Sequence, residues 1–451
     1  MAVTAVIVAA GRGTRLRAGC KPLAVVGGVT LLERALATAT AAGIRRKVVV
    51  VSALDGPVAS FCRRQCSDVE VVCAPDHDRG NGATVAAGLA HAGGRCLVMM
   101  VDHLQEPATL RRVLDADGEL VFAVDSRAAY VDPDEATLVR RENGAVVAID
   151  KRLASFDAIE AGLAVCSAEP LVELAATLHG DLEFNRLKTA WLDAGHRIDA
   201  VDIDGAFWAD IDTPDERRRA IGHLVDRYGA KRTDGPVARV LNRPLSNLVS
   251  RRLLATRIGP NALTIANLAL LVLSGLLLAL GAHSDLLLVA GGVLVQLSSA
   301  LDGVDGELAR VSGRSSERGA VLDAICDRYG DLAVLAGAAV AAGTPAAWPW
   351  AMAALVANWQ LSFLRREHER VAGHLPASHV RWQWSRDVRL LVLALSCVLL
   401  HPLWGLVIAA VAGNLDALRR LRALLAATSV SSSRSSSAVG VMPGAGRRRT
   451  T

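Results

Sequence analysis

Asp302-Gly-Val-Asp-Gly-Glu-Leu-Ala-Arg310 opens a stretch that continues, after eight residues, with Gly319, Asp323 and Asp327. It joins two long apolar runs, so its carboxylates fall within segments that have the composition of membrane-spanning helices. A carboxylate in such a segment is costly unless it is paired or binds a cation. The group of four carboxylates therefore predicts a metal site in a helical membrane domain.

The spacing of these carboxylates places each pair on one helix face. Asp302 and Asp305 are three residues apart, and Asp323 and Asp327 are four apart. In an antiparallel hairpin centred between residues 312 and 313, Asp302 is level with Asp323. We expect all four to converge near the cytoplasmic boundary, where their oxygens would hold Mg²⁺ or Mn²⁺. A cluster that serves only ion passage or helix association is the alternative.

The C-terminal half of the chain contains five long apolar runs. They are residues 262–282, 286–301, 319–342, 346–364 and 390–413, the last interrupted by His401-Pro402. A span needs about 20 apolar residues, so four spans follow, and the last run gives one kinked span or two short ones. Arginines gather in loops 310–318 and 365–389, whereas the turns near 282–285 and 343–345 carry no Lys or Arg. The positive-inside rule then predicts six spans in the cytoplasmic membrane, with a cytoplasmic N-terminus and both active sites on the cytoplasmic side.

Length and composition require a second domain. A chain of 451 residues is longer than a single hydrophobic core usually supports. The hydrophobic content is 52% and the mean hydropathy is +0.32, both high for a soluble enzyme, whereas the 21% of charged residues is ordinary. The apolar excess must therefore be concentrated in one part of the chain. The net charge of +5 and the lack of a basic stripe with aromatics argue against nucleic acid as a partner. The eight cysteines have no paired CxxC spacing, which argues against a zinc ribbon or a disulfide framework.

The order of segments predicts an α/β domain followed by an all-α membrane domain. Residues 1–228 alternate short Val-rich runs with Ala- and Leu-rich stretches, which is typical of a mostly parallel sheet covered on both faces. The expected strands are 5–9, 47–52, 69–73 and 96–101, with helices over 31–42 and 84–91. Residues 229–257 form a linker and a basic amphipathic helix at the membrane surface, with a solvated linker helix as the alternative. The membrane domain covers 258–425, and the Ser-rich residues 426–451 are expected to be disordered.

The membrane stretch resembles the CDP-alcohol phosphotransferase family, whose signature D-x2-D-G-x2-A-R-x8-G-x3-D-x3-D it matches at every position. The resemblance covers roughly residues 240–425. It implies a six-span fold in which a metal site binds a CDP-alcohol and an acceptor hydroxyl displaces CMP. It also implies metal ligands, a general base and CDP contacts. These are Asp302, Asp305 and Asp323 as ligands, Asp327 as the base, and Gly306, Ala309 and Arg310 as contacts.

A glycine-rich turn follows the first predicted strand. Gly11-Arg12-Gly13-Thr14-Arg15 precedes Lys21-Pro22-Leu23, and such a turn offers backbone N–H groups to phosphates. It lacks the GK[ST] of a P-loop and the GxGxxG of a Rossmann fingerprint, so neither an ATPase nor a dehydrogenase fits well. The pattern resembles sugar-phosphate nucleotidyltransferases over about residues 1–225, which implies a Rossmann-like domain with a mixed sheet.

This second resemblance implies roles for several residues. Gly11, Gly13, Arg15 and Lys21 would bind a triphosphate, Asn81 and Gly82 the base, Lys151 the acceptor phosphate, and Asp102 with Asp210 a Mg²⁺ ion. Asp212 stays open as the alternative to Asp210, because both leave the strand on one face. Two of these residues have purely structural alternatives: Lys151 could be a solvated lysine at the end of a strand, and Asp102 could be a helix cap or turn residue. We expect His103 to have a packing role.

The fusion resembles the family of bifunctional inositol-1-phosphate cytidylyltransferases and di-myo-inositol-phosphate phosphate synthases, with local agreement at 101–103, 151–162, 242–246 and 385–389. The resemblance implies that CTP and inositol 1-phosphate give CDP-inositol and pyrophosphate. CDP-inositol and a second inositol 1-phosphate then give di-myo-inositol phosphate phosphate and CMP. Arg365, Arg386 and Arg389 are candidates for the acceptor phosphate.

Two questions stay open at this stage. A cytidylyltransferase for another phosphoalcohol, coupled to phospholipid synthesis by the membrane domain, is the alternative function. A second copy of the chain is a candidate partner through the membrane domain, beside the lipid bilayer itself, but the sequence leaves the oligomeric state undetermined.

Overall fold

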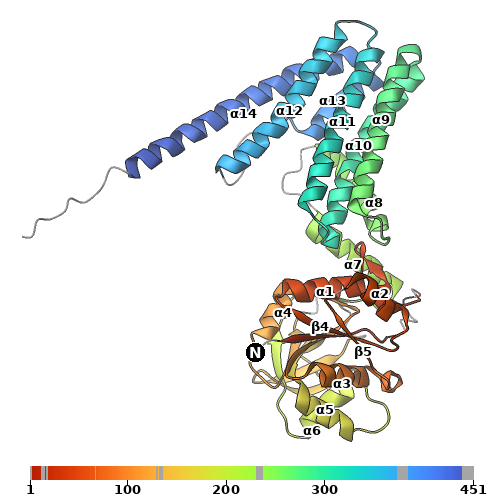
Figure 1. Ribbon diagram of the computed structural model, residues 1–451, viewed down its shortest axis with the longest axis vertical. Coiled ribbons are helices and arrows are strands. Elements are labelled where there is room, and N and C mark those ends of the chain that lie inside the picture. The colour runs from red at the N-terminus through yellow and green to blue at the C-terminus, as the bar shows by residue number, and fades with distance from the viewer. Residues whose placement is uncertain are drawn as a thin grey trace, which may run out of the picture. The chain divides into compact units, whose positions relative to one another are not determined.

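The computed structural model describes residues 3–11, 16, 19–66, 68–127, 131, 136–229, 237–372 and 384–438. The chain divides into two compact units (Figure 1). The first is Met1–Leu224 with Leu253–Arg257, and the second is Val225–Arg252 with Ile258–Thr451. Residues 230–236 of the predicted linker lie outside the described residues.

The first unit is built on a nine-stranded sheet in the order β5-β4-β1-β6-β11-β8-β12-β10-β9. One half is parallel and the other is mixed, since β11 runs antiparallel to both β6 and β8. In the order of the sheet, the strands are β5 (Glu70–Cys73), β4 (Arg46–Val51), β1 (Thr4–Val8), β6 (Arg95–Met100), β11 (Ala158–Ser167), β8 (Leu120–Asp125), β12 (Asp199–Asp202), β10 (Ala145–Asp150) and β9 (Leu138–Glu142).

Helices cover both faces of this sheet, as the alternating sequence predicts (Figure 1). One face carries α1 (Leu31–Ala41), α2 (Pro57–Gln65) and α4 (Pro107–Leu114), and the other carries α3 (Asn81–Ala92), α5 (Ala168–Thr177) and α6 (Phe184–Asp193). The four predicted strands and two predicted helices of the first hundred residues are confirmed. The expectation of a mostly parallel sheet holds for β5, β4, β1 and β6 and for the pair β8–β12, whereas the other pairings are antiparallel.

The second unit is all helical. Helix α8 (Arg243–Leu253), predicted to lie at the membrane surface, precedes α9 (Pro260–Leu280), α10 (Asp285–Ser312), α11 (Glu317–Ala341), α12 (Ala347–Ala372), α13 (Arg386–Val398) and α14 (Pro402–Ala438). The last apolar run, residues 390–413, is divided between α13 and α14, which agrees with the prediction of two segments and not one kinked span. The chain turns at Leu400, whose φ is +63°, and Pro402 then starts the next helix.

Small residues let α9 approach α11 closely. A Cβ on Gly275 would lie 2.4 Å from the carbonyl oxygen of Ala333, and one on Gly337 would lie 2.2 Å from the carbonyl oxygen of Gly275. Such contacts are typical of helices that pack in a membrane, where close backbone approach replaces the hydrophobic effect. Within the described residues, Pro260–His283 and Asp285–Ser312 have the length and hydropathy of membrane spans.

Helix α14 reaches Ala438, beyond residue 426, where the sequence predicts that a disordered tail begins. Residues 439–451 lie outside the described part of the chain, and the character of the tail stays a prediction.

Candidate functional sites

The first candidate site lies where β6 ends. Asp102 follows this strand, and His103 in β7 (His103–Leu104) pairs with Asp210 in β13 (Ala209–Asp210). One ligand atom from each of these three residues lies within 4.8 Å of the other two. The strand pairing therefore brings Asp210 beside Asp102 and His103, which are adjacent to each other but far from Asp210 in the sequence.

The imidazole of His103 is fixed on two sides. Its Nδ1 lies 3.0 Å from Oδ1 of Asp102, and its ring stacks on Trp208 with centroids 5.8 Å apart. Trp208 is itself held, because its Nε1 donates a 2.9 Å hydrogen bond to the buried Asp125. His103 thus packs as expected and also orients Asp102.

Lys21 brings a positive charge into this group. Its buried Nζ contacts Asp102 and Asp212. Burial disfavours the ammonium, but the charges of Asp102 and Asp210 outweigh that effect and raise the pKa of Lys21. Burial would likewise raise the pKa of Asp102, but hydrogen bonds and charge from His103 and Lys21 hold it below its usual range.

The donor set suits a hard divalent cation. Burial raises the pKa of Asp210 to about 6, and its Oδ1 is buried without a hydrogen-bond partner among the described residues. Burial opposes protonation of His103, yet the carboxylates of Asp210 and Asp102 raise its pKa to about 9. Two carboxylates with an unused buried oxygen are the ligands that Mg²⁺ prefers. Asp210 is the residue whose oxygen lies within 4.8 Å of ligand atoms of both Asp102 and His103, so the geometry favours Asp210 over Asp212 as the second ligand.

The second candidate site lies between α10 and α11, both of which pack against α9. Asp302, Asp323 and Asp327 each place one oxygen within 4.8 Å of the other two. The loop between the helices covers residues 313–316, so the hairpin centre lies about two residues later than predicted. Asp302 is therefore level with Asp327 as well as near Asp323, and three carboxylates again suit Mg²⁺ or Mn²⁺.

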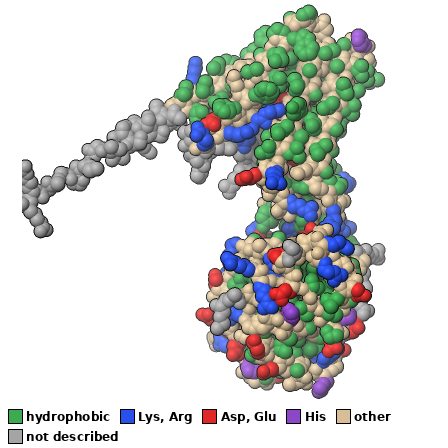
Figure 2. All heavy atoms as spheres, viewed as in Figure 1, with side chains coloured by type: hydrophobic (Ala, Val, Ile, Leu, Met, Phe, Trp, Pro, Cys, Tyr) green, Lys and Arg blue, Asp and Glu red, His purple; other side chains and the backbone are tan. Residues whose placement is uncertain are grey.

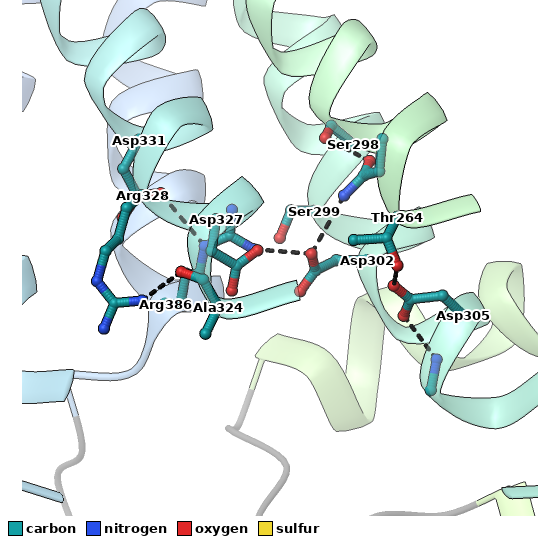
Figure 3. A network of polar contacts seen from close by, with 12 residues as sticks. Thr264, Ser298, Ser299, Asp302, Asp305, Ala324, Asp327, Arg328, Asp331 and Arg386 are labelled. Carbon is teal, nitrogen blue, oxygen red and sulfur yellow. Dashed lines mark hydrogen bonds and ion pairs between the residues drawn. The ribbon is translucent and has the colours of Figure 1, made fainter. Parts of the chain in front are cut away.

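Asp305 lies outside this group of three. Its carboxylate accepts hydrogen bonds from the hydroxyl of Thr264 and from the backbone N–H of Gly306 (Figure 3). Thr264 begins a polar face of α9 that continues one turn later with Asn267, whose Nδ2 donates to Asp302 at 3.1 Å. Three of the four carboxylates thus converge as predicted. The fourth, Asp305, is oriented by Thr264 of α9 instead.

Arg386 reaches this site from α13. Its Nη1 lies 2.8 Å from Asp302 and 3.0 Å from Asp327, and its Nε lies 3.2 Å from Asp331 (Figure 3). The guanidinium therefore links α10, α11 and α13 at the carboxylates, in the position of a counter-ion that offsets their mutual repulsion.

Comparisons with known proteins agree with a chain of two joined enzymes. The family model described as MobA-like NTP transferase domain matches residues 5–371. A protein of Rubrobacter xylanophilus named bifunctional IPC transferase and DIPP synthase is 43% identical over 427 residues, which are 94% of this chain and 96% of that protein. The chain belongs to the family of bifunctional IPC transferases and DIPP synthases.

Two further relatives extend this picture. The bifunctional IPC transferase and DIPP synthase of Aquifex aeolicus is 33% identical over 80% of this chain and 83% of its own length. A phosphatidylinositol phosphate synthase of Mycobacteroides abscessus is 37% identical over 23% of this chain and 45% of its own length. The prediction that this family member is a bifunctional transferase is thereby confirmed.

Other predicted residues of the N-terminal unit have varied surroundings. Gly11 is exposed, while Gly13 and Arg15 lie outside the described residues. Asn81 accepts a 2.7 Å hydrogen bond from the backbone of Phe184. Gly82 packs against the backbone of residues 182–183, and Lys151 is exposed just after β10. The nucleotide and phosphate roles of these residues stay predictions.

The predicted CDP contacts of the helical unit lie on α10. Gly306 and Ala309 are partly buried there, and the guanidinium of Arg310 donates to the backbone carbonyls of Tyr228 and Gly229. The prediction overlooked Glu307, which is fully buried and accepts from Arg243, Ser246 and Ser250. It also overlooked Asp331, although its position four residues after Asp327 places both on one helix face.

Proposed function

We propose that this chain makes CDP-inositol from CTP and inositol 1-phosphate in its N-terminal unit and consumes it in its helical unit. The observation that carries the proposal is the presence of two separate carboxylate groups, one in each unit, in a member of this bifunctional family. The helical unit transfers the inositol phosphate group to a second inositol 1-phosphate, and CMP leaves.

In the first reaction, a phosphate oxygen of inositol 1-phosphate attacks the α-phosphorus of CTP. The new P–O bond forms as the α–β bond breaks, and pyrophosphate leaves. Asp102 and Asp210 would hold Mg²⁺, which neutralises the phosphates when bound. Lys21 adds positive charge, and His103 keeps Asp102 oriented. No proton has to be removed from the nucleophile, so positioning and charge neutralisation carry the rate.

In the second reaction, a hydroxyl of the acceptor attacks the β-phosphorus of CDP-inositol, and the bond to the α-phosphate breaks. Asp327 takes the hydroxyl proton, as a carboxylate beside the reacting group can do. Asp302, Asp305 and Asp323 would hold the metal ions at the diphosphate, with Thr264 and Asn267 orienting two of these side chains. Arg386 and Arg389 bind the acceptor phosphate, and Arg365 is a further candidate for this role.

All six helices α9–α14 cross the cytoplasmic membrane in this proposal, and both sites face the cytoplasm. Large apolar side chains are exposed on every one of these helices, which supports contact with lipid. One example from each helix is Ile265, Leu286, Val321, Phe363, Leu395 and Trp404. Figure 2 shows apolar side chains over much of the visible face of this unit. The arginine-rich inner loops support the orientation.

The test uses detergent-purified full-length protein, stripped of lipid, with CTP, Mg²⁺ and labelled inositol 1-phosphate. The label should enter CDP-inositol and then a water-soluble compound that contains two inositols, as seen by mass spectrometry. Label that appears only in the organic phase after lipid is restored would assign the second step to phospholipid synthesis. Absence of CDP-inositol would mean that the N-terminal unit activates another phosphoalcohol.

A further inference from the structure

Asp331 is a buried carboxylate that the CDP-alcohol phosphotransferase signature does not contain. It lies on α11 one turn beyond Asp327, and its side chain is 7% exposed. Both of its oxygens are used by other helices. Oδ1 accepts from Nε of Arg386 on α13 at 3.2 Å, and Oδ2 accepts from Nδ2 of Asn358 on α12 at 3.0 Å.

The contact at Nε fixes the orientation of the Arg386 guanidinium. This planar group has donors on three nitrogens, and Nη1 is already engaged by Asp302 and Asp327. With Nε held by Asp331 as well, the plane of the group is determined. The remaining nitrogen, Nη2, is buried and has no hydrogen-bond partner among the described residues. Figure 3 shows Arg386 set between Asp331 and the carboxylates of the site.

An unpartnered buried guanidinium nitrogen is costly, and a phosphate oxygen is its best acceptor. A long arginine side chain without an anchor at Nε would lose this geometry, because each hydrogen bond would then have to overcome the rotational freedom of the group. The Nε anchor therefore fixes the direction in which the unpartnered Nη2 points.

We infer that Asp331 is the positioning residue that aims Arg386 at the phosphate of the acceptor. The inference rests on the proposed second reaction and adds to it the residue that sets acceptor selectivity. Asp331 acts through Arg386 and does not touch the reacting atoms. Asn358 supports it from α12 by holding its second oxygen.

The surroundings of Asn358 offer a charge-only variant. Asp331, Asn358 and Arg389 border a small cavity whose other walls are apolar, and Oδ1 of Asn358 is buried without a partner in the described part of the chain. In Asp331→Asn, the amide of Asn358 can flip and accept from the new amide, while the remaining oxygen still accepts from Arg386. This variant keeps the shape and the hydrogen bonds but removes the charge. Asp331→Ala removes all three.

The experiment measures transfer from supplied CDP-inositol by full-length protein, with inositol 1-phosphate or with unphosphorylated inositol as acceptor. In Asp331→Ala, KM for inositol 1-phosphate should rise roughly tenfold or more, the loss expected when a hydrogen bond to a charged group is weakened. The rate with inositol should change much less, so the preference for the phosphorylated acceptor falls. Asp331→Asn should lie between wild type and Asp331→Ala.

Two controls separate this role from a structural one. Asp416 is equally buried and pairs with Arg419 and Arg420 on its own helix, so Asp416→Ala removes a buried carboxylate without touching Arg386. It should leave the acceptor preference unchanged. Cytidylyl transfer should stay at the wild-type rate in every variant, which reports an intact N-terminal unit, and the retained rate with inositol as acceptor reports an intact helical unit.

Equal losses with both acceptors, in Asp331→Ala and in Asp331→Asn, would overturn the inference and assign Asp331 to the carboxylate group or to the fold. A KM unchanged in Asp331→Ala would overturn it as well. Failure of the proposed function has a different signature, because wild-type protein would then form no water-soluble product with two inositols from CDP-inositol.

Discussion

Gly162 and His103 are in such close contact that a Cβ on Gly162 would lie 2.3 Å from Cδ2 of the imidazole. Gly162 has a φ of +68° and sits where β11 changes register between Glu160 and Ala164. The irregularity of the strand thus makes room for the ring that orients Asp102. A feature of the central sheet thereby shapes the first candidate site.

Gly162→Ala should abolish most cytidylyl transfer, because the new methyl group must displace His103 and with it Asp102. Gly144→Ala is the matched control, since Gly144 also has a positive φ of +77° but nothing within 4 Å of its Cβ position. Both variants carry the backbone strain of about 1–2 kcal/mol, and only the first should lose CDP-inositol formation. Pyrophosphate release from CTP measures the result. Equal activity in the two variants would show that the position of the His103 ring is unimportant for cytidylyl transfer.

Asp210→Asn and Asp212→Asn should differ in their response to Mg²⁺. Asp210 belongs to the group with Asp102, so its amide variant should need a much higher Mg²⁺ concentration for half-maximal cytidylyl transfer. Asp212 contacts Lys21, so its variant should mainly raise KM for CTP. Mg²⁺ titrations at saturating CTP, followed by CTP titrations at saturating Mg²⁺, separate the two effects. The reverse pattern would make Asp212 the ligand.

Periodicity and motif spacing were enough to predict the parts of this protein that depend on neighbouring residues. The parallel strands, the split at Pro402 and the pairing of Asp323 with Asp327 on one helix face all follow from local rules. The pairing of β7 with β13 does not, because it joins segments about a hundred residues apart through tertiary packing. The sequence could point to Asp102 and Asp210 only through resemblance.

The site of the helical unit likewise combines features that local rules predict with features that depend on tertiary packing. The hairpin register was predicted about two residues too early, because the length of the turn depends on where α10 ends at the left-handed Gly313. Arg386 was predicted as an inner-loop arginine and a candidate for the acceptor phosphate. Its role as a counter-ion was not predicted, because its distance to Asp302 is decided by how α13 packs on α10. The spacing of Asp331, four residues after Asp327, could have placed it on the same helix face as the other carboxylates. Its burial could not be read from the sequence.

Arg243→Ala should destabilise the helical unit strongly, because Glu307 is fully buried and would lose the only positive charge that the described contacts give it. Removing one partner of a buried pair costs about 3–5 kcal/mol. The double variant Arg243→Ala with Glu307→Gln should recover part of this loss, since no buried charge is left. Arg251→Ala, which breaks an exposed pair with Asp226, should cost about 1 kcal/mol or less. Thermal unfolding of full-length protein in detergent measures all three, and a similar loss for Arg251→Ala would contradict the assignment.

The three grouped carboxylates of the helical unit, Asp302, Asp323 and Asp327, should not be equivalent. Asp327→Asn should bind CDP-inositol and Mg²⁺ nearly as well as wild type but lose transfer, because the amide cannot take the acceptor proton. Asp302→Asn should weaken Mg²⁺-dependent binding as well, since an amide is a poorer ligand than a carboxylate at the diphosphate. Asp302 and Asp327 both contact Nη1 of Arg386, so the loss of that ion pair is common to the two variants and cannot explain a difference between them.

Binding of CDP-inositol to each full-length variant, measured with and without Mg²⁺, distinguishes the two roles when it is set beside the rate of transfer. Cytidylyl transfer should be unchanged in both variants, because the residues of the first site lie in the other unit. An equal loss of nucleotide binding would argue that Asp327 is a metal ligand, in keeping with its place beside Asp302 and Asp323. Transfer retained by Asp327→Asn would exclude it as the base and direct the search to Asp305 or Asp323.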